Sequence, residues 1–178
     1  MKKDSLKSII VITAICLVIA ALMAAINSIT APMIAEANAK AEKEALFTVL
    51  PDAEDFSKVD TDMELPESVT AVYAETKGRG YAVMLKAKGY DSSNPIVIAV
   101  GIDTEGKITK CHVVSCNGET SGIGTKVNTP AFLDQFSGAD KSLGGVDTIS
   151  GATISSGAFV SAVNDAFLVY EMTKEAGK

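Results

Sequence analysis

A run of small and hydroxyl-bearing residues lies directly before an apolar, helix-forming stretch near the end of the sequence. Its letters are DTISGATISS, at residues 147–156. Gly151 and Ala152 are small enough to let a bulky group approach the backbone, and Thr153 adds a hydroxyl at the same place. The free N–H groups at a helix start and the positive end of its dipole favour a phosphate. The run therefore predicts a phosphate-bearing ligand, unless the serines only cap the helix and the glycine only makes a turn.

The pattern D-x-x-S-G-A-T at residues 147–153 resembles the flavinylation motif of the FMN-binding domains in Rnf G and Nqr C subunits. In that family a flavin transferase joins FMN through its phosphate to the threonine hydroxyl. The resemblance therefore implies covalent FMN on Thr153, within a recognition context formed by its neighbours. These neighbours are Asp147, Ser150, Gly151, Ala152, Ser155 and Ser156.

A glycine-rich stretch at residues 119–126, ETSGIGTK, resembles the E-T-P-G-L-G segment that lies against the flavin ring in the same family. Two departures bear on the rigidity of this loop and on the hydrogen bonding of the flavin: Ser121 replaces the usual proline, and Asn117 stands near a histidine of many relatives. Two charged residues of the stretch, Glu119 and Lys126, either tune the flavin or belong to the ordinary surface. The cofactor contacts implied here are Glu119, Thr120, Gly122, Ile123, Gly124 and Lys126.

Four short runs rich in β-branched residues and separated by Gly, Asp and Asn predict an antiparallel meander before and beside these motifs. The runs are Val69–Glu75, residues 81–88, residues 96–102 and Ile108–Ser115. The third run is continuously apolar at residues 96–100, so we expect it at the centre of the sheet, covered on both faces. Gly89-Tyr90, Pro95-Ile96 and the VGID of residues 100–103 resemble strand signatures of the family, and the likeness covers residues 78–165.

Two helices are predicted after the strands. Thr129 and Pro130 are typical of an N-cap and first helical residue, and they indicate a short helix that ends near Phe136. A final helix is expected over residues 156–174, where apolar side chains recur at helical spacing. They are Phe159, Val160, Val163, Phe167 and Tyr170. The expected fold class is α+β, with helices packed on a mostly antiparallel sheet.

A membrane anchor is expected near the N-terminus. Residues 9–26 contain no charge, and the next charged residue is Glu36, so the stretch is long enough for a transmembrane helix. The lysines that precede it place the N-terminus in the cytoplasm and the later domain outside the cell membrane. A cleaved signal peptide ending near residues 37–39 is one alternative, and a pilin-like helix is another.

The predicted organisation has three parts. Residues 1–30 form the cytoplasmic N-terminus and the transmembrane helix. Residues 31–68 form an amphipathic stalk, which stops before Pro51, and an irregular connection. Residues 69–178 form the extracytoplasmic FMN-binding domain.

Composition excludes several classes of function. The net charge of −6 argues against nucleic-acid binding, which needs clustered Lys and Arg. One histidine and three cysteines without a paired motif support no metal site. Cys111 and Cys116 lie five residues apart on one predicted strand, about 16 Å between Cα atoms, so we expect them to stay reduced.

The family resemblance implies an electron-transfer component of a redox-driven ion translocase, a ferredoxin:NAD⁺ oxidoreductase. It has no catalytic residue of its own and relays electrons through FMN. The implied partners are the other Rnf proteins, of the A, B, C, D and E types, above all D, A and E, with a flavin transferase and membrane lipid. An Nqr C-type protein, a stand-alone membrane-anchored flavin reductase and a tethered binding domain without redox function are the alternatives.

Overall fold

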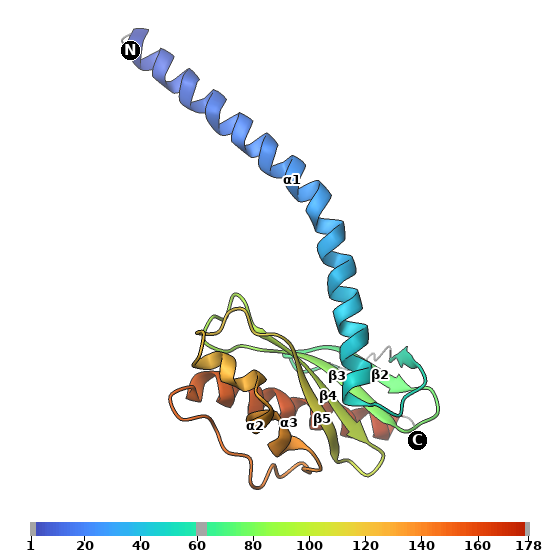
Figure 1. Cartoon of the computed structure of the whole chain (residues 1–178). Coiled ribbons are helices and arrows are strands. Elements are labelled where there is room, and N and C mark those ends of the chain that lie inside the picture. The colour runs from blue at the N-terminus through green and yellow to red at the C-terminus, as the bar shows by residue number, and fades with distance from the viewer. Residues whose placement is uncertain (1–2, 60–63, 177–178) are drawn as a thin grey trace. The chain divides into compact units, whose positions relative to one another are not determined.

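The computed structural model describes residues 3–59 and 64–176 of the chain (Figure 1). The chain forms two compact units, which divide between Ala41 and Glu42. The second unit is therefore larger than the domain predicted at residues 69–178, because it also takes in the residues from Glu42 onward.

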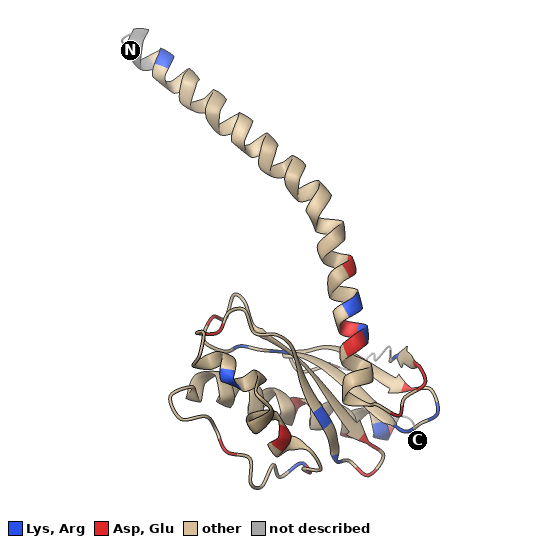
Figure 2. Ribbon diagram, in the orientation of Figure 1, with Lys and Arg blue, Asp and Glu red and all other residues tan. Residues whose placement is uncertain are grey.

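The first unit consists of most of helix α1 (Lys3–Val49). Its most apolar stretch has a mean hydropathy of 3.1, and none of that stretch is buried within the protein. The helix is therefore long and apolar enough to cross a membrane. Figure 2 shows the charge-free length of α1 between Lys7 and Glu36. A helix pairs its own backbone N–H and C=O groups, as the hydrocarbon core of a bilayer requires because it offers no water to bond them. The predicted long apolar helix and its continuation before Pro51 are confirmed, with Pro32 inside the helix.

The second unit is built on a five-stranded antiparallel sheet in which every strand pairs with its neighbour in sequence. The strands are β1 (Phe56–Lys58), β2 (Val69–Glu75), β3 (Gly80–Ala87), β4 (Ile96–Asp103) and β5 (Ile108–Ser115). The predicted antiparallel meander is confirmed. The prediction of an irregular connection missed β1, which pairs with β2 through Phe56 and Glu75. The prediction that residues 96–100 lie at the centre was wrong in detail, because β3 is the middle strand.

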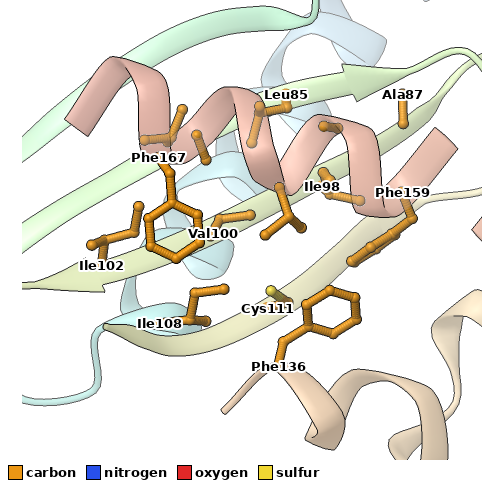
Figure 3. Packing of buried hydrophobic residues seen from close by; sticks show 14 of the residues in the cluster. Leu85, Ala87, Ile98, Val100, Ile102, Ile108, Cys111, Phe136, Phe159 and Phe167 are labelled. Carbon is orange, nitrogen blue, oxygen red and sulfur yellow. The ribbon is translucent and has the colours of Figure 1, made fainter. Parts of the chain in front are cut away.

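Both faces of the sheet are covered. Alternate side chains of β4 point to opposite faces, as strand geometry requires. Ile98 and Val100 join one buried cluster, where they meet Phe159 and Phe167 of the last helix (Figure 3). Ala99 joins the other cluster, which contains the last turns of α1. That second cluster consists of Ala45, Leu46, Val49, Leu50, Ala71, Ala82, Met84 and Ala99.

Helical segments follow the sheet: η1 (Gly124–Asn128), α2 (Pro130–Leu133), η2 (Asp134–Phe136) and α3 (Thr153–Ala176). The short helix predicted up to Phe136 is thus divided into α2 and η2. Thr129 holds the N-cap position, but its hydroxyl donates backward to the Lys126 carbonyl at 2.7 Å. Helix α3 begins at Thr153, three residues before the predicted start, so the α+β class is confirmed with the hydroxyl motif at a helix N-terminus.

Candidate cofactor site

A hollow of about 390 Å³ opens where the glycine-rich loop faces the start of α3. This volume lies within the range of about 300–1,000 Å³ that is usual for small-molecule pockets. None of the described residues that line it carries a charge. They are Tyr90, Thr120, Ile123, Gly124, Gly151, Ala152, Thr153, Ile154 and Ser155.

Thr153 is exposed, lines the hollow and is the first residue of α3. The turn before it is closed by the Ala152 N–H, which donates to the Ile149 carbonyl at 2.9 Å. Gly151 lies in this turn with φ +79, a left-handed conformation that a glycine adopts without strain. The first N–H groups of a helix have no acceptor within the helix, and its dipole is positive there. The Thr153 hydroxyl is therefore suited to carry a phosphate.

Ser156 holds this turn in place from behind. Its side chain is buried, and its hydroxyl accepts a hydrogen bond from the Ile149 N–H at 3.0 Å and donates to the Ala152 carbonyl at 2.8 Å. The Ser156 N–H also donates to the Ala152 carbonyl, at 2.9 Å. Ser156 thus fixes the approach to Thr153 without lining the hollow.

The glycine-rich loop forms the opposite wall. The N–H groups of Ile123 and Thr125 both donate to the Thr120 carbonyl, at 3.1 and 3.2 Å. The Gly122 N–H donates to the Thr125 hydroxyl at 2.9 Å. Gly122 has φ +73, a left-handed conformation that would be strained in a residue with a side chain. These bonds hold a turn that presents Ile123 to the hollow although the family's proline is replaced by Ser121.

Glu119 lies behind both walls, with only 7% of its surface exposed. Its Oε1 accepts a hydrogen bond from the Tyr90 N–H at 2.9 Å, and its Oε2 accepts one from the Ser155 hydroxyl. A Cβ added at Gly89 would lie 2.9 Å from the Glu119 carboxyl carbon, and one added at Gly124 would lie 2.5 Å from Oε2. The two glycines therefore make the room that this carboxylate occupies.

The rim of the hollow is apolar. Outside α1, four large apolar side chains of the described residues are exposed, and three of them line the hollow: Tyr90 at 68%, Ile123 at 47% and Ile154 at 62%. Exposed apolar groups that gather around a pocket mark a binding surface. A flat aromatic ligand with a phosphate at one end fits this rim and the helix start beside it.

The structure brings together most of the predicted site residues. Those that line the hollow are Thr120, Ile123, Gly124, Gly151, Ala152, Thr153 and Ser155, with Glu119 and Ser156 behind them. Those outside its lining are Gly122, Lys126, Asp147 and Ser150. Asp147 is exposed, and its N–H donates to the Gln135 side-chain oxygen at 2.9 Å.

The sequence reasoning missed two residues of the lining, Tyr90 and Ile154. Tyr90 belongs to the G-Y signature, so the family pattern contained a signal for it. Ile154 falls outside the set of apolar residues that recur with helical spacing, and this position could have indicated a side chain facing a ligand.

The FMN-binding domain family matches residues 89–167, a range that holds β4, β5 and every residue of the lining. Together with α1, this domain defines the class of protein: a membrane-anchored flavoprotein of the FMN-binding type.

Similar proteins define the class more narrowly. The G subunit of an ion-translocating oxidoreductase complex from Methanosarcina acetivorans is 34% identical over 92% of this chain and 93% of its own length. The G subunit of a Na(+)-translocating ferredoxin:NAD(+) oxidoreductase complex from Acetobacterium woodii is 30% identical over 91% of this chain and 89% of its own. The G subunit of a proton-translocating ferredoxin:NAD(+) oxidoreductase complex from Clostridium ljungdahlii is 29% identical over 87% of this chain and 85% of its own length. The chain therefore belongs to the G-subunit family of the Rnf ion-translocating oxidoreductase complexes.

Proposed function

We propose that this chain is the electron-transferring G subunit of a ferredoxin:NAD⁺ oxidoreductase complex, and that it carries FMN joined by a phosphoester bond to Thr153. The observation that carries the proposal is the place of Thr153, an exposed hydroxyl at the N-terminus of a 24-residue helix, on the wall of an uncharged hollow. The names and lengths of the similar proteins support the assignment to the complex.

The protein's residues have distinct roles in this proposal. The helix start stabilises the phosphate, because its N–H groups and dipole favour negative charge. Tyr90, Ile123 and Ile154 would hold the flavin ring through apolar contacts and keep water away from it. FMN supplies the redox chemistry, since it exchanges one or two electrons and the protein sets its position and potential. No acid or base of the protein is required.

The residues around Thr153 would serve the enzyme that attaches the flavin. Asp147, Ser150 and Gly151 are exposed on the turn before the threonine, where a flavin transferase can reach them. Ser155 and Ser156 are buried, so they would act by holding the shape of the site. Gly122 and Lys126 lie outside the lining of the hollow and would act through the loop that carries Ile123.

We place the N-terminus in the cytoplasm and the flavin domain on the outer side of the cell membrane, beside the D, A and E subunits. The lysines before α1 support this orientation. A covalent link has a physical reason on that side, because a cofactor that dissociated there could not be replaced from the cytoplasmic pool. A membrane-impermeant maleimide should label a cysteine introduced at exposed Ser93 in intact cells. Labelling only after the cells are broken would contradict the orientation.

Attachment is tested by producing the chain together with a flavin transferase and precipitating it with acid. We expect wild-type protein to retain yellow colour and in-gel fluorescence, with an intact mass increased by FMN, and Thr153→Ala to lose all three. Thr148→Ala is the matched control, because Thr148 is an exposed threonine in the same loop but not in the lining. Wild-type protein without the added mass would overturn the proposal and favour a tethered binding domain.

A further inference from the structure

The Glu119 carboxylate joins three segments that are distant in sequence. It accepts hydrogen bonds from the Tyr90 N–H, after β3, and from the Ser155 hydroxyl, in the first turn of α3, while Glu119 itself begins the glycine-rich loop. Both donors belong to residues that line the hollow, whereas Glu119 does not. Glu119 therefore connects the two walls of the hollow through two hydrogen bonds.

The negative charge of Glu119 is not neutralised by a cation. Its two hydrogen-bond donors are neutral, and no ion pair among the described residues includes it. Both oxygens accept hydrogen bonds, which is the pattern of an ionised carboxylate. The charge is buried, where screening by water is weak. Its field reaches neighbouring groups: burial, and secondarily the charge of Glu119, raises the pKa of the Cys116 thiol.

We propose that Glu119 is a positioning residue for the FMN of this domain, and that its uncompensated charge lowers the reduction potential of that flavin. The inference rests on the function proposed above. It assigns Glu119 two separable effects: its shape holds the walls that receive the ring, and its charge acts on the ring through them.

The effect on the potential follows from charge balance. When dithionite supplies two electrons and water supplies one proton, the flavin gains one negative charge. A fixed negative charge just behind the wall opposes that gain, so it stabilises the oxidised form relative to the reduced form.

Glu119→Gln separates the two effects. The amide oxygen still accepts from the Tyr90 N–H, and the amide nitrogen can donate to the Ser155 hydroxyl, so the shape is kept and the charge removed. We expect FMN attachment within twofold of wild type, measured by intact mass. In a dye-equilibrated titration, the ratio of reduced to oxidised flavin at a fixed ambient potential should rise about tenfold. For a two-electron couple this corresponds to a reduction potential about 30 mV higher than that of wild type.

Glu119→Asp is the opposite variant. It keeps the charge but withdraws it by one methylene from its two donors, so attachment should fall several-fold while the loaded fraction keeps a potential close to that of wild type. Glu105→Gln is the matched control, because Glu105 is an exposed acid in the β4–β5 turn, 75% exposed in its side chain, and should change neither measurement.

A wild-type potential in loaded Glu119→Gln would overturn the inference and leave the proposed function intact. An equal shift in Glu105→Gln would overturn it as well, since the effect would then be one of net charge. Folded Glu119→Gln, checked by circular dichroism, that takes up no FMN would also overturn it, because the amide retains both contacts. Wild-type protein without FMN would overturn both proposals.

Discussion

The carbonyl of Val49, the last residue of α1, accepts a hydrogen bond of 2.5 Å from the hydroxyl of Thr109 on β5. The membrane helix therefore does not end at the surface of the flavin domain. Its last turns are part of the domain's core, and the residues that follow the anchor cannot be treated as a dispensable linker.

Truncation tests this relationship. A chain that begins at Glu42 should fold to a monomeric domain, whereas one that begins at Pro51 loses the buried side chains of Leu46, Val49 and Leu50. At about 1.5–3 kcal/mol for each, the loss approaches the total stability of about 5–15 kcal/mol for a domain. Thermal unfolding by circular dichroism measures the difference. Equal melting temperatures for the two chains would show that the last turns of α1 do not contribute to the core of the domain.

Gly101 provides a second test of the packing between the sheet and the last turns of α1. A Cβ added there would overlap the Val49 carbonyl oxygen and lie 2.9 Å from its carbonyl carbon, with backbone atoms that have no freedom to withdraw. Gly101→Ala should therefore cost about 1–3 kcal/mol in urea unfolding. Gly157→Ala is the control, since a Cβ at this α3 position meets nothing within 4 Å. It should leave the protein unchanged or stabilise it by up to about 1 kcal/mol.

Ser156→Ala should weaken both the fold and flavin attachment. The change leaves the Ile149 N–H without its side-chain acceptor, which costs about 1–3 kcal/mol when the group is buried. The turn before Thr153 then loses its support, and the rate of attachment by the transferase should fall. Ser161→Ala, at an exposed position of α3, should affect neither the free energy of unfolding nor the rate. Normal attachment in Ser156→Ala would show that the turn does not depend on this hydroxyl.

Tyr73 should make stability depend on alkaline pH. Burial, and then the hydrogen bond of 2.7 Å to Glu42, raises the pKa of Tyr73 from 10.0 to about 12. A group whose pKa is higher in the folded state stabilises the protein fully below its unfolded pKa, and the contribution is lost as the pH rises through the folded pKa. The free energy of unfolding of wild type should therefore decline between pH 10 and pH 12 relative to that of Tyr73→Phe. Parallel pH profiles in urea unfolding would contradict this.

The sequence predicted the parts of the fold that depend on local pattern. Strands β2 and β5 have the predicted bounds, because runs of β-branched residues end there at turn-forming neighbours. Strand β1 escaped prediction because its three residues are held by pairing with β2 rather than by their own pattern. Helix η1 lies in a glycine-rich stretch where helical propensity is low, and its fold depends on contacts made by the loop.

The part of the site that lies within one sequence motif could be predicted. The part that depends on contacts between segments distant in sequence could not. Thr153 and its turn lie within one short run of sequence. Glu119, by contrast, meets partners 29 and 36 residues away, so no local pattern could distinguish its buried position from a place on the surface.

The order of the strands has a consequence for how the mature protein is made. Every strand of the sheet pairs with the one that precedes it in the chain, so pairing can proceed stepwise while synthesis is still under way. Helix α3 is the last element to emerge, and it carries Thr153 to the finished walls. If FMN is attached to Thr153 as proposed, flavin fluorescence of the protein would report that synthesis and folding have proceeded past the sheet and the glycine-rich loop to the start of α3.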